Sequence, residues 1–107
     1  MSKAFEDKML DYLEKYVEVA YEVKEIVKKI DLDAKVYVFG SIVRGKYTAS
    51  SDIDMLVVTE RLGEKYRMMV EVYKKIDAPI ELHITTPEKF TGWYKKFIQP
   101  DEMVEIK

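Results

Sequence analysis

Residues 36–58 read VYVFGSIVRGKYTASSDIDMLVV and carry the clearest signal in this chain. They comprise an apolar strand, a turn at Gly40 and Ser41, a short basic loop, and a second apolar strand with Asp52 and Asp54. Side chains alternate along a strand, so the two carboxylates are expected on the same face. A Gly-Ser turn after a strand presents backbone N–H groups that suit a phosphate. Carboxylates beside such a turn indicate nucleotide chemistry.

The composition indicates a folded protein with one modest core. The chain has 107 residues, 48% of them hydrophobic, with four glycines and three prolines, and we expect one domain over residues 1–107. The absence of cysteine excludes disulfides, thiolate metal sites and cysteine nucleophiles. No apolar run approaches the ~20 residues of a membrane span, and the first residues are unlike a signal peptide. We therefore expect a cytoplasmic protein.

The charge pattern restricts the partners. The net charge is −2, and acidic and basic residues are interleaved, which argues against a broad nucleic-acid surface. A small nucleotide remains compatible because it needs only a local site. Charged residues make up 36% of the chain, mostly Lys and Glu, a composition that resembles hyperthermophile proteins.

Residues 4–30 predict one long amphipathic helix. Apolar residues recur every three or four positions, and no Gly or Pro interrupts them. At 1.5 Å per residue the helix would be roughly 39 Å long, more than a small sheet needs for cover. We expect the helix to cover one face of a sheet. The alternative is that the excess, including Tyr12 and Tyr16, contacts a partner chain or a second copy in a homo-oligomer.

Two further helices are predicted. Residues 64–76 form the first, and its apolar face is expected to comprise Tyr66, Met69, Val70, Tyr73 and Ile76. Thr86, Pro87 and Glu88 are typical of a helix start. The aromatic run that follows, Phe90, Trp93, Tyr94 and Phe97, is expected in the core. The alternative is an exposed Trp93 or Tyr94 that stacks on a base or contacts a partner.

Strands are predicted at residues 34–39, 53–58 and 80–85. The element order predicts an α/β (α+β) domain, with a small mixed sheet of three or four strands flanked by helices. The connection between the first two strands is compatible with parallel or antiparallel pairing. Residues 101–107 either add a strand or pack loosely.

The spacing between the Gly-Ser turn and the two aspartates resembles that of a known family. Gly40 and Ser41 are followed after ten residues by Asp52-Ile53-Asp54, and Glu81 lies on the next strand. This resembles the polymerase-β nucleotidyltransferase signature, G-S-x10-D-x-D with a third carboxylate on a later strand. In particular, GSIVRGKYTASSDID is similar to the minimal nucleotidyltransferase (MNT) group, whose members often read G-S-x-A-R-G and S-D-x-D. The resemblance covers residues 36–84; Glu81 stands where the superfamily commonly has Asp.

The resemblance implies a polymerase-β-like core that uses ATP or another NTP and two Mg²⁺ ions held by Asp52, Asp54 and Glu81. These residue types also suit the chemistry, because Mg²⁺ prefers a few carboxylates together with phosphate oxygens and water. Two carboxylates can bridge two ions that hold the attacking and leaving oxygens. Glu81 can complete the site or accept the proton of the acceptor hydroxyl. The alternatives are a solvated acidic face for the aspartates and a surface position for Glu81.

The phosphate side of the site is expected around the turn. Gly40 lets the backbone approach the triphosphate, and Ser41 can hydrogen-bond it or cap a helical turn. Arg44 or Lys46 can balance charge on pyrophosphate, and the alternative for Arg44 is a structural ion pair. His83 shares a face with Glu81 and is expected to be an ordinary partly buried residue.

The preferred function is an enzyme that moves a nucleoside monophosphate, AMP from ATP, to an acceptor hydroxyl on another chain. The resemblance implies a candidate partner, since MNT proteins frequently pair with HEPN-family toxins and some modify them on a tyrosine. One alternative is a non-catalytic nucleotide-binding antitoxin that acts by contact. Another is a subunit that modifies a small molecule such as an aminoglycoside. No residue identified in the sequence reads the nucleobase.

Overall fold

A four-stranded mixed sheet forms the centre of the computed structural model, which describes residues 2–107. The strands are β1 (Lys35–Phe39), β2 (Ile53–Val58), β3 (Ile80–Thr85) and β4 (Met103–Glu105), in the order β3-β2-β1-β4. β1 is antiparallel to β2 and β4, whereas β2 and β3 are parallel. The predicted mixed sheet is confirmed, the first two strands are antiparallel, and the C-terminal tail supplies a strand.

This connectivity sets which strand ends meet. A short loop joins the antiparallel β1 and β2, while the parallel β2 and β3 need the crossover helix α3 (Lys65–Lys75), preceded by a 3₁₀ turn at Leu62–Glu64. The carboxyl end of β1 therefore lies beside the amino ends of β2 and β3. Gly40, Asp54 and Glu81 come together at this corner.

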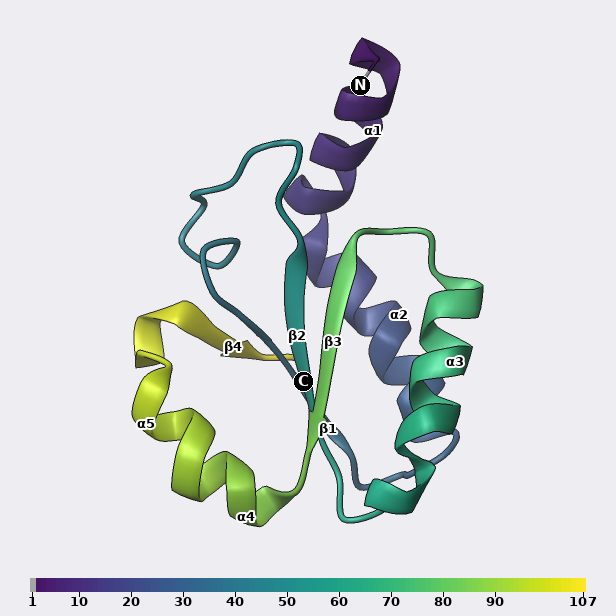
Figure 1. Ribbon diagram of the computed structural model, residues 1–107, viewed down its shortest axis with the longest axis vertical. Helices are drawn as coiled ribbons and strands as arrows, with labels where there is room; N and C mark the ends of the chain where they lie inside the picture. The colour runs from purple at the N-terminus through teal and green to yellow at the C-terminus, as the bar shows by residue number, and fades with distance from the viewer. Residues whose placement is uncertain (1) are drawn as a thin grey trace.

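Helices cover the sheet on both faces (Figure 1). On one face, α2 (Tyr16–Lys28) and α3 bury the larger core, which includes Val38, Met55 and Val57. On the other face, Phe90 from the C-terminal helical segment packs on Tyr37, with ring centroids 4.6 Å apart. Because residues of β2 alternate between these faces, Asp54 lies on the second face, beyond this smaller cluster.

The N-terminal helix is divided, so the expectation of one helix over residues 4–30 is wrong. α1 (Lys3–Glu14) ends at Lys15, whose φ of −101° and ψ of 29° leave the helical range, and α2 starts at the next residue. The two helices meet at an angle, and α1 projects past the end of the sheet (Figure 1). No Gly or Pro causes the break; α2 follows the sheet, whereas α1 reaches the core only near its end, through Leu13. Tyr12 and Tyr16 pack partly against that core.

The predicted apolar face of α3 is only partly confirmed: Ile76 is buried and Met69 packs partly against the core, as expected, but the other three residues are exposed. Met68 and Val72 are fully buried, whereas Val70 is 59% exposed and Tyr66 and Tyr73 are also exposed. The sequence of α3 contains two apolar stripes, and the crossover between β2 and β3 brings the aliphatic one onto the sheet. The Tyr73 hydroxyl instead accepts a hydrogen bond of 2.9 Å from the Leu82 N–H on edge strand β3.

The orientation of α3 predicts different costs for two valine truncations. Val72→Ala removes two methyl groups from a fully buried site and is expected to lower the free energy of unfolding by about 2 kcal/mol. Val70→Ala, two residues earlier on the exposed side, is expected to change it by less than about 0.5 kcal/mol. Chemical denaturation of both variants measures the difference. Equal costs would contradict the observed helix orientation.

The C-terminal helical segment contains a π turn. It runs through α4 (Pro87–Lys89), the π segment Phe90–Tyr94 and α5 (Lys95–Phe97), and the Thr86 side chain caps it as predicted. Phe90 is buried, but Trp93 is 56% and Phe97 66% exposed, so the expected aromatic core run is wrong for these two. Phe90 and Tyr94 pack in the smaller cluster on the sheet, whereas Trp93 and Phe97 contact each other on the exposed side, with ring centroids 4.9 Å apart.

Candidate active site

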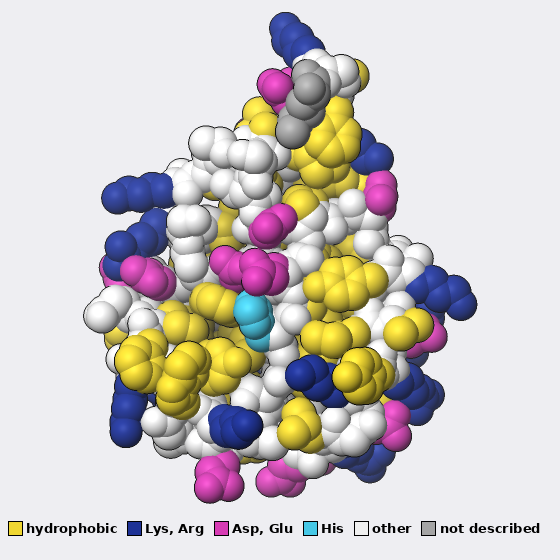
Figure 2. Space-filling view, in the orientation of Figure 1, with side chains coloured by type: hydrophobic (Ala, Val, Ile, Leu, Met, Phe, Trp, Pro, Cys, Tyr) yellow, Lys and Arg dark blue, Asp and Glu magenta, His cyan; other side chains and the backbone are white. Residues whose placement is uncertain are grey.

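Three ligand-type side chains converge on the second face of the sheet. Asp54 pairs with Glu81 across the parallel strands β2 and β3, and His83 lies two residues further along the same face. One donor atom from each of Asp54, Glu81 and His83 lies within 4.8 Å of the other two. Figure 2 shows the chain's single histidine, in cyan, beside acidic side chains in magenta. We call these three residues the ligand cluster.

The Gly40 turn closes directly against the ligand cluster. Gly40 has a φ of +89°, and a Cβ at this position would lie 3.0 Å from Asp54 Oδ2. The turn is anchored by Ile42, which is buried in the core. It ends at Gly45, with φ +72°, through hydrogen bonds from Gly45 N–H to Ile42 O and Lys46 N–H to Ser41 O. A hydrogen-bonded turn over residues 41–45 therefore follows β1, and glycine at position 40 lets backbone and carboxylate approach closely.

The ligand cluster changes the acidity of Asp54. Partial burial, hydrogen bonding to Glu81 and the negative charges of Glu81 and Asp52 together raise the pKa of Asp54 to about 6. Carboxylates so close to one another favour a shared proton or a bound cation. A hard divalent cation fits this arrangement, because it supplies the positive charge that the oxygens of Asp54 and Glu81 lack.

The remaining residues predicted for the site lie around the ligand cluster. Asp52 precedes β2, is exposed, and falls outside the three residues whose donors lie within 4.8 Å of one another. Its charge nevertheless contributes to the raised pKa of Asp54. Ser41 and Lys46 are exposed to solvent in the β1–β2 connection. Their roles in phosphate binding, like the metal-binding role of Asp52, stay predictions.

Arg44 is engaged with the C-terminal segment. Its guanidinium lies 2.8 Å from Glu102 Oε1 and 3.2 Å from Asp101 Oδ2. The Gly40 N–H also donates to the Glu102 carbonyl, at 2.9 Å, so the segment before β4 is tied to the turn at two points. Arg44 thus makes the structural ion pair that was one of its two predicted roles, and its binding to pyrophosphate stays a prediction.

Removing the Arg44 charge is expected to loosen this connection. Arg44→Gln removes partly exposed, charge-assisted contacts and is expected to cost about 1 kcal/mol of stability. It should also speed hydrogen exchange at the Gly40 amide, which bonds to Glu102. Lys46→Gln is the control, since Lys46 forms no ion pair within residues 2–107. Equal exchange rates at Gly40 in both variants would contradict the proposed tie.

His83 is partly buried and shares a face with Glu81, as expected, and the structure also places it near Asp54. Its Nε2 lies 3.7 Å from Glu81 Oε1, and its ring packs on Phe39 at a centroid distance of 5.6 Å. The available signal was the Glu-x-His alternation on one strand, which places both side chains on one face. Phe39 was not predicted at the site because no sequence pattern pairs β1 with β3 across the intervening strand β2.

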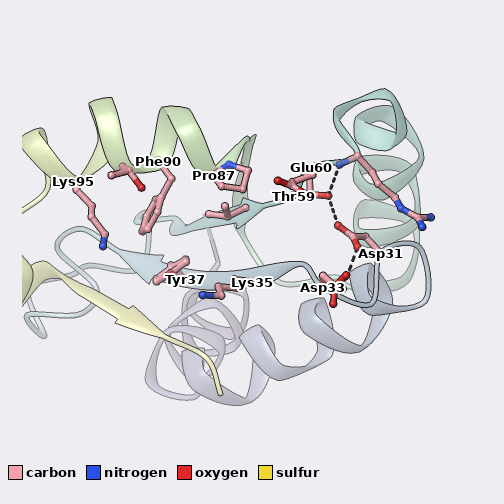
Figure 3. A pocket seen from close by; sticks show the side chains of 12 residues that line it. Asp31, Asp33, Lys35, Tyr37, Thr59, Glu60, Pro87, Phe90 and Lys95 are labelled. Carbon is pink, nitrogen blue, oxygen red and sulfur yellow. Dashed lines mark hydrogen bonds between the residues drawn. The ribbon is translucent and has the colours of Figure 1, made fainter.

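A cavity of about 540 Å³ lies near the other end of this sheet face (Figure 3). Its lining includes Tyr37, Phe90 and Asp31, and none of the ligand cluster. Asp31 is buried, but its carboxylate accepts hydrogen bonds from the Thr59 hydroxyl and the Asp33 N–H (Figure 3). These bonds hold the connection between α2 and β1 against the end of β2, which is a structural role.

The fold and the site together define a class of protein. Acids from two adjacent strands meet a Gly-Ser turn on the second face of the mixed sheet, an arrangement suited to metal-assisted transfer of a phosphate-bearing group. The family model described as nucleotidyltransferase domain matches residues 20–106. The chain belongs to this nucleotidyltransferase domain family.

Solved structures agree with this assignment. One crystal structure, of a protein assigned as a nucleotidyltransferase, is 35% identical with a TM-score of 0.64, over 81% of this chain and 96% of that one. Another, from Sulfolobus solfataricus and likewise assigned, is 23% identical with a TM-score of 0.55, over 98% and 87% of the two chains; this likeness concerns the fold alone. A comparison with curated proteins finds no match. The predicted family is confirmed, and with it a domain for nucleotidyl transfer.

No helix within residues 2–107 is long and apolar enough to cross a membrane.

Proposed function

We propose that this protein transfers AMP from ATP, with Mg²⁺, to a hydroxyl group on a partner protein such as a HEPN-family toxin. The observation that carries the proposal is the convergence of Asp54 and Glu81 beside the Gly40 turn, with Asp54 Oδ2 only 3.0 Å from where a Cβ of residue 40 would lie. Carboxylate oxygens and a close backbone turn are the two parts that a nucleoside triphosphate with its metal requires.

Each residue has a defined task in this proposal. Asp54 and Glu81 present carboxylate oxygens on the same sheet face, and exposed Asp52 adds a third acid at the entrance. The Ser41 N–H makes no backbone hydrogen bond within residues 2–107, so it is free to donate to a phosphate oxygen. Two bound Mg²⁺ ions would supply the charge that stabilises the attacking and leaving oxygens.

The transfer itself is a substitution at the α-phosphorus of ATP. The bond from this phosphorus to the pyrophosphate oxygen breaks, and a bond to the acceptor oxygen forms. Glu81, whose side chain is 57% exposed, can take the hydroxyl proton directly or through water. Pyrophosphate leaves toward the loop that carries Ser41 and Lys46.

The surface around the ligand cluster supports a protein acceptor. Hydrophobic side chains lie on both sides of the acidic group, over the α3 and α5 segments (Figure 2). The exposed ones on these segments include Tyr66, Val70, Tyr73 and Phe97. Exposed apolar groups beside a site are typical of protein interaction surfaces. Phe5, Val17 and Tyr21, exposed on α1 and α2, offer a second surface for a partner or for another copy of this chain.

The test is a transfer assay with α-labelled nucleotides. Wild-type protein, Mg²⁺ and the protein encoded beside it are incubated with each of the four NTPs, and label on protein is followed by electrophoresis and mass spectrometry. We expect label from ATP on a hydroxyl side chain of the partner, and none with Asp54→Asn. Glu81→Gln tests the third carboxylate separately, and unchanged turnover in this variant would remove Glu81 from the chemistry.

The main alternative is an antitoxin that acts by contact alone. Under that alternative, wild type and Asp54→Asn would bind and neutralise the partner equally, with no label transferred by either. This result would refute AMP transfer to a protein. Label on a small molecule such as an aminoglycoside, rather than on the partner, would support nucleotidyl transfer but would show that the acceptor is a small molecule and not a protein.

A further inference from the structure

His83 occupies a position that a purely oxygen-based magnesium site does not need. The parallel register places Asp54 beside Glu81 and Leu56 beside His83, so His83 follows Glu81 along the same face. Its donor nitrogen lies within 4.8 Å of a carboxylate oxygen of both acids. Two carboxylates and one imidazole therefore face a common centre.

The imidazole is held by packing rather than by a hydrogen bond to Glu81. Its Nε2 is 3.7 Å from Glu81 Oε1, longer than the ~2.7–3.2 Å of an N–H···O hydrogen bond. Its ring instead packs on Phe39 at 5.6 Å, and the His83 side chain is 36% exposed. Phe39 itself pairs with Asp54 across β1 and β2, so one short piece of sheet orients both side chains. The His83 nitrogen is therefore held beside Asp54 and Glu81 and remains accessible to a metal ion from solvent.

A nitrogen donor changes which cation such a site prefers. Mg²⁺ favours oxygen ligands almost exclusively, whereas imidazole suits Fe²⁺, Ni²⁺, Cu²⁺ and Zn²⁺, and Mn²⁺, which shares the preference of Mg²⁺ for oxygen, also accepts an imidazole beside carboxylates. We propose that His83 is a direct metal ligand together with Asp54 and Glu81, and that this site binds a divalent transition ion, with Mn²⁺ as the probe, more tightly than Mg²⁺. The inference deepens the proposed function, since it concerns the metal at the same site.

The single histidine makes the test unambiguous. In full-length protein without a histidine tag, any imidazole nitrogen bound to Mn²⁺ must come from His83. We expect electron spin-echo modulation from a coordinated nitrogen in wild-type protein loaded with Mn²⁺ alone, and its loss in His83→Phe. The phenyl ring preserves the packing on Phe39 and removes only the donor. His83→Gln is a second variant in case the first does not fold, with folding checked by circular dichroism.

Affinity provides the second readout. His83→Phe is expected to weaken Mn²⁺ binding about tenfold, by titration of the free-ion resonance, and to change Mg²⁺ binding less than about twofold. Asp7→Asn, an exposed acid on α1, is the control and should bind both ions as wild type does. A wild-type protein that binds Mn²⁺ without the nitrogen signal, or does not bind it, would overturn the proposal. Equal Mn²⁺ affinity in wild type and both His83 variants would do the same.

The inference and the proposed function fail in different ways. AMP transfer that depends on Asp54, combined with no nitrogen signal from Mn²⁺, would refute the role of His83 and leave the function standing. A clear nitrogen signal with no transfer to any acceptor would support the metal site and refute the function.

Discussion

Asp54→Asn is expected to stabilise the metal-free protein at pH 7 while it strongly slows nucleotidyl transfer. The pKa of Asp54 is raised from 3.8 to about 6, first by burial and then by Glu81 and Asp52, so at pH 7 the folded state holds a disfavoured negative charge. Converting the whole pKa shift to free energy at about 1.4 kcal/mol per pKa unit would overestimate the change in stability, because part of the carboxyl group stays in contact with water. We expect a gain of about 1–2 kcal/mol in the free energy of unfolding.

The sign of this effect predicts its pH dependence. Below pH 3.8, Asp54 is protonated in both the folded and unfolded states, and asparagine brings no charge advantage. As pH rises from 3.8 to about 6, the unfolded wild-type chain releases the proton first, and the wild-type protein loses stability relative to the variant. The advantage of Asp54→Asn should therefore grow across this range and stay constant above it.

Urea denaturation at several pH values measures this prediction. Asp7→Asn removes an exposed acid on α1 and should show no such gain. Addition of Mg²⁺ should raise the stability of the wild type and leave Asp54→Asn unchanged, because a cation needs the carboxylate. A variant that is less stable than wild type at pH 7 without metal would contradict the electrostatic account of the ligand cluster.

The same substitution should lower the transfer rate by roughly a hundredfold to a thousandfold, the range seen when one preorganised charge or donor is lost. The amide keeps the size and much of the hydrogen bonding of the carboxylate, so the loss reports on charge. A variant that is more stable but less active than wild type is expected when the wild-type residue serves function at the expense of stability. A transfer rate within tenfold of wild type would exclude Asp54 from the reaction.

Gly40→Ala is expected to damage the protein in two separable ways. The φ of +89° is strained for any residue with a Cβ, at a cost of about 1–3 kcal/mol. The new methyl group would also lie 3.0 Å from Asp54 Oδ2, so the carboxylate or the turn must move. A displacement of about 1 Å in a reacting arrangement can cost about a hundredfold in rate, and we expect a loss of that size in transfer.

Gly45→Ala separates the two effects. Gly45 also has a positive φ, +72°, but a Cβ there meets nothing within 4 Å. We expect a similar loss of stability and a loss of transfer of at most a few-fold. Thermal unfolding and single-turnover transfer rates of both variants provide the comparison. Equal losses of transfer in the two would show that the contact with Asp54 does not position the carboxylate.

Much of the site was predictable because its parts are close in sequence. Gly40, Ser41, Asp52 and Asp54 fall within residues 36–58, and strand alternation assigns Asp54 to one face of the sheet. The register of β2 with β3, which brings Glu81 beside Asp54, was expected in outline from strand order. Local sequence patterns do not predict the close approach of Gly40 to Asp54. They do not predict the ion pairs of Arg44 with Asp101 and Glu102 either.

The helices were predicted less well, for a shared reason. Periodicity identified apolar stripes, but α3 has two of them, and only packing chose Met68 and Val72. Periodicity also assumes one helix geometry throughout, whereas residues 90–94 form a π turn, in which Trp93 is exposed. The division at Lys15 occurs where the sequence has no glycine or proline, so periodicity did not predict it.

The sequence by itself determined the family, the strands, the Gly-Ser turn and the acids, because these depend on residue type and on spacing within one or two elements. Only the tertiary structure decided that β1 and β2 are antiparallel, which face α3 buries, and that His83 joins Asp54 and Glu81. Those outcomes depend on how elements distant in sequence pack against one another. The free energy that selects among such packings comes from burial across the whole core, and no local pattern encodes it.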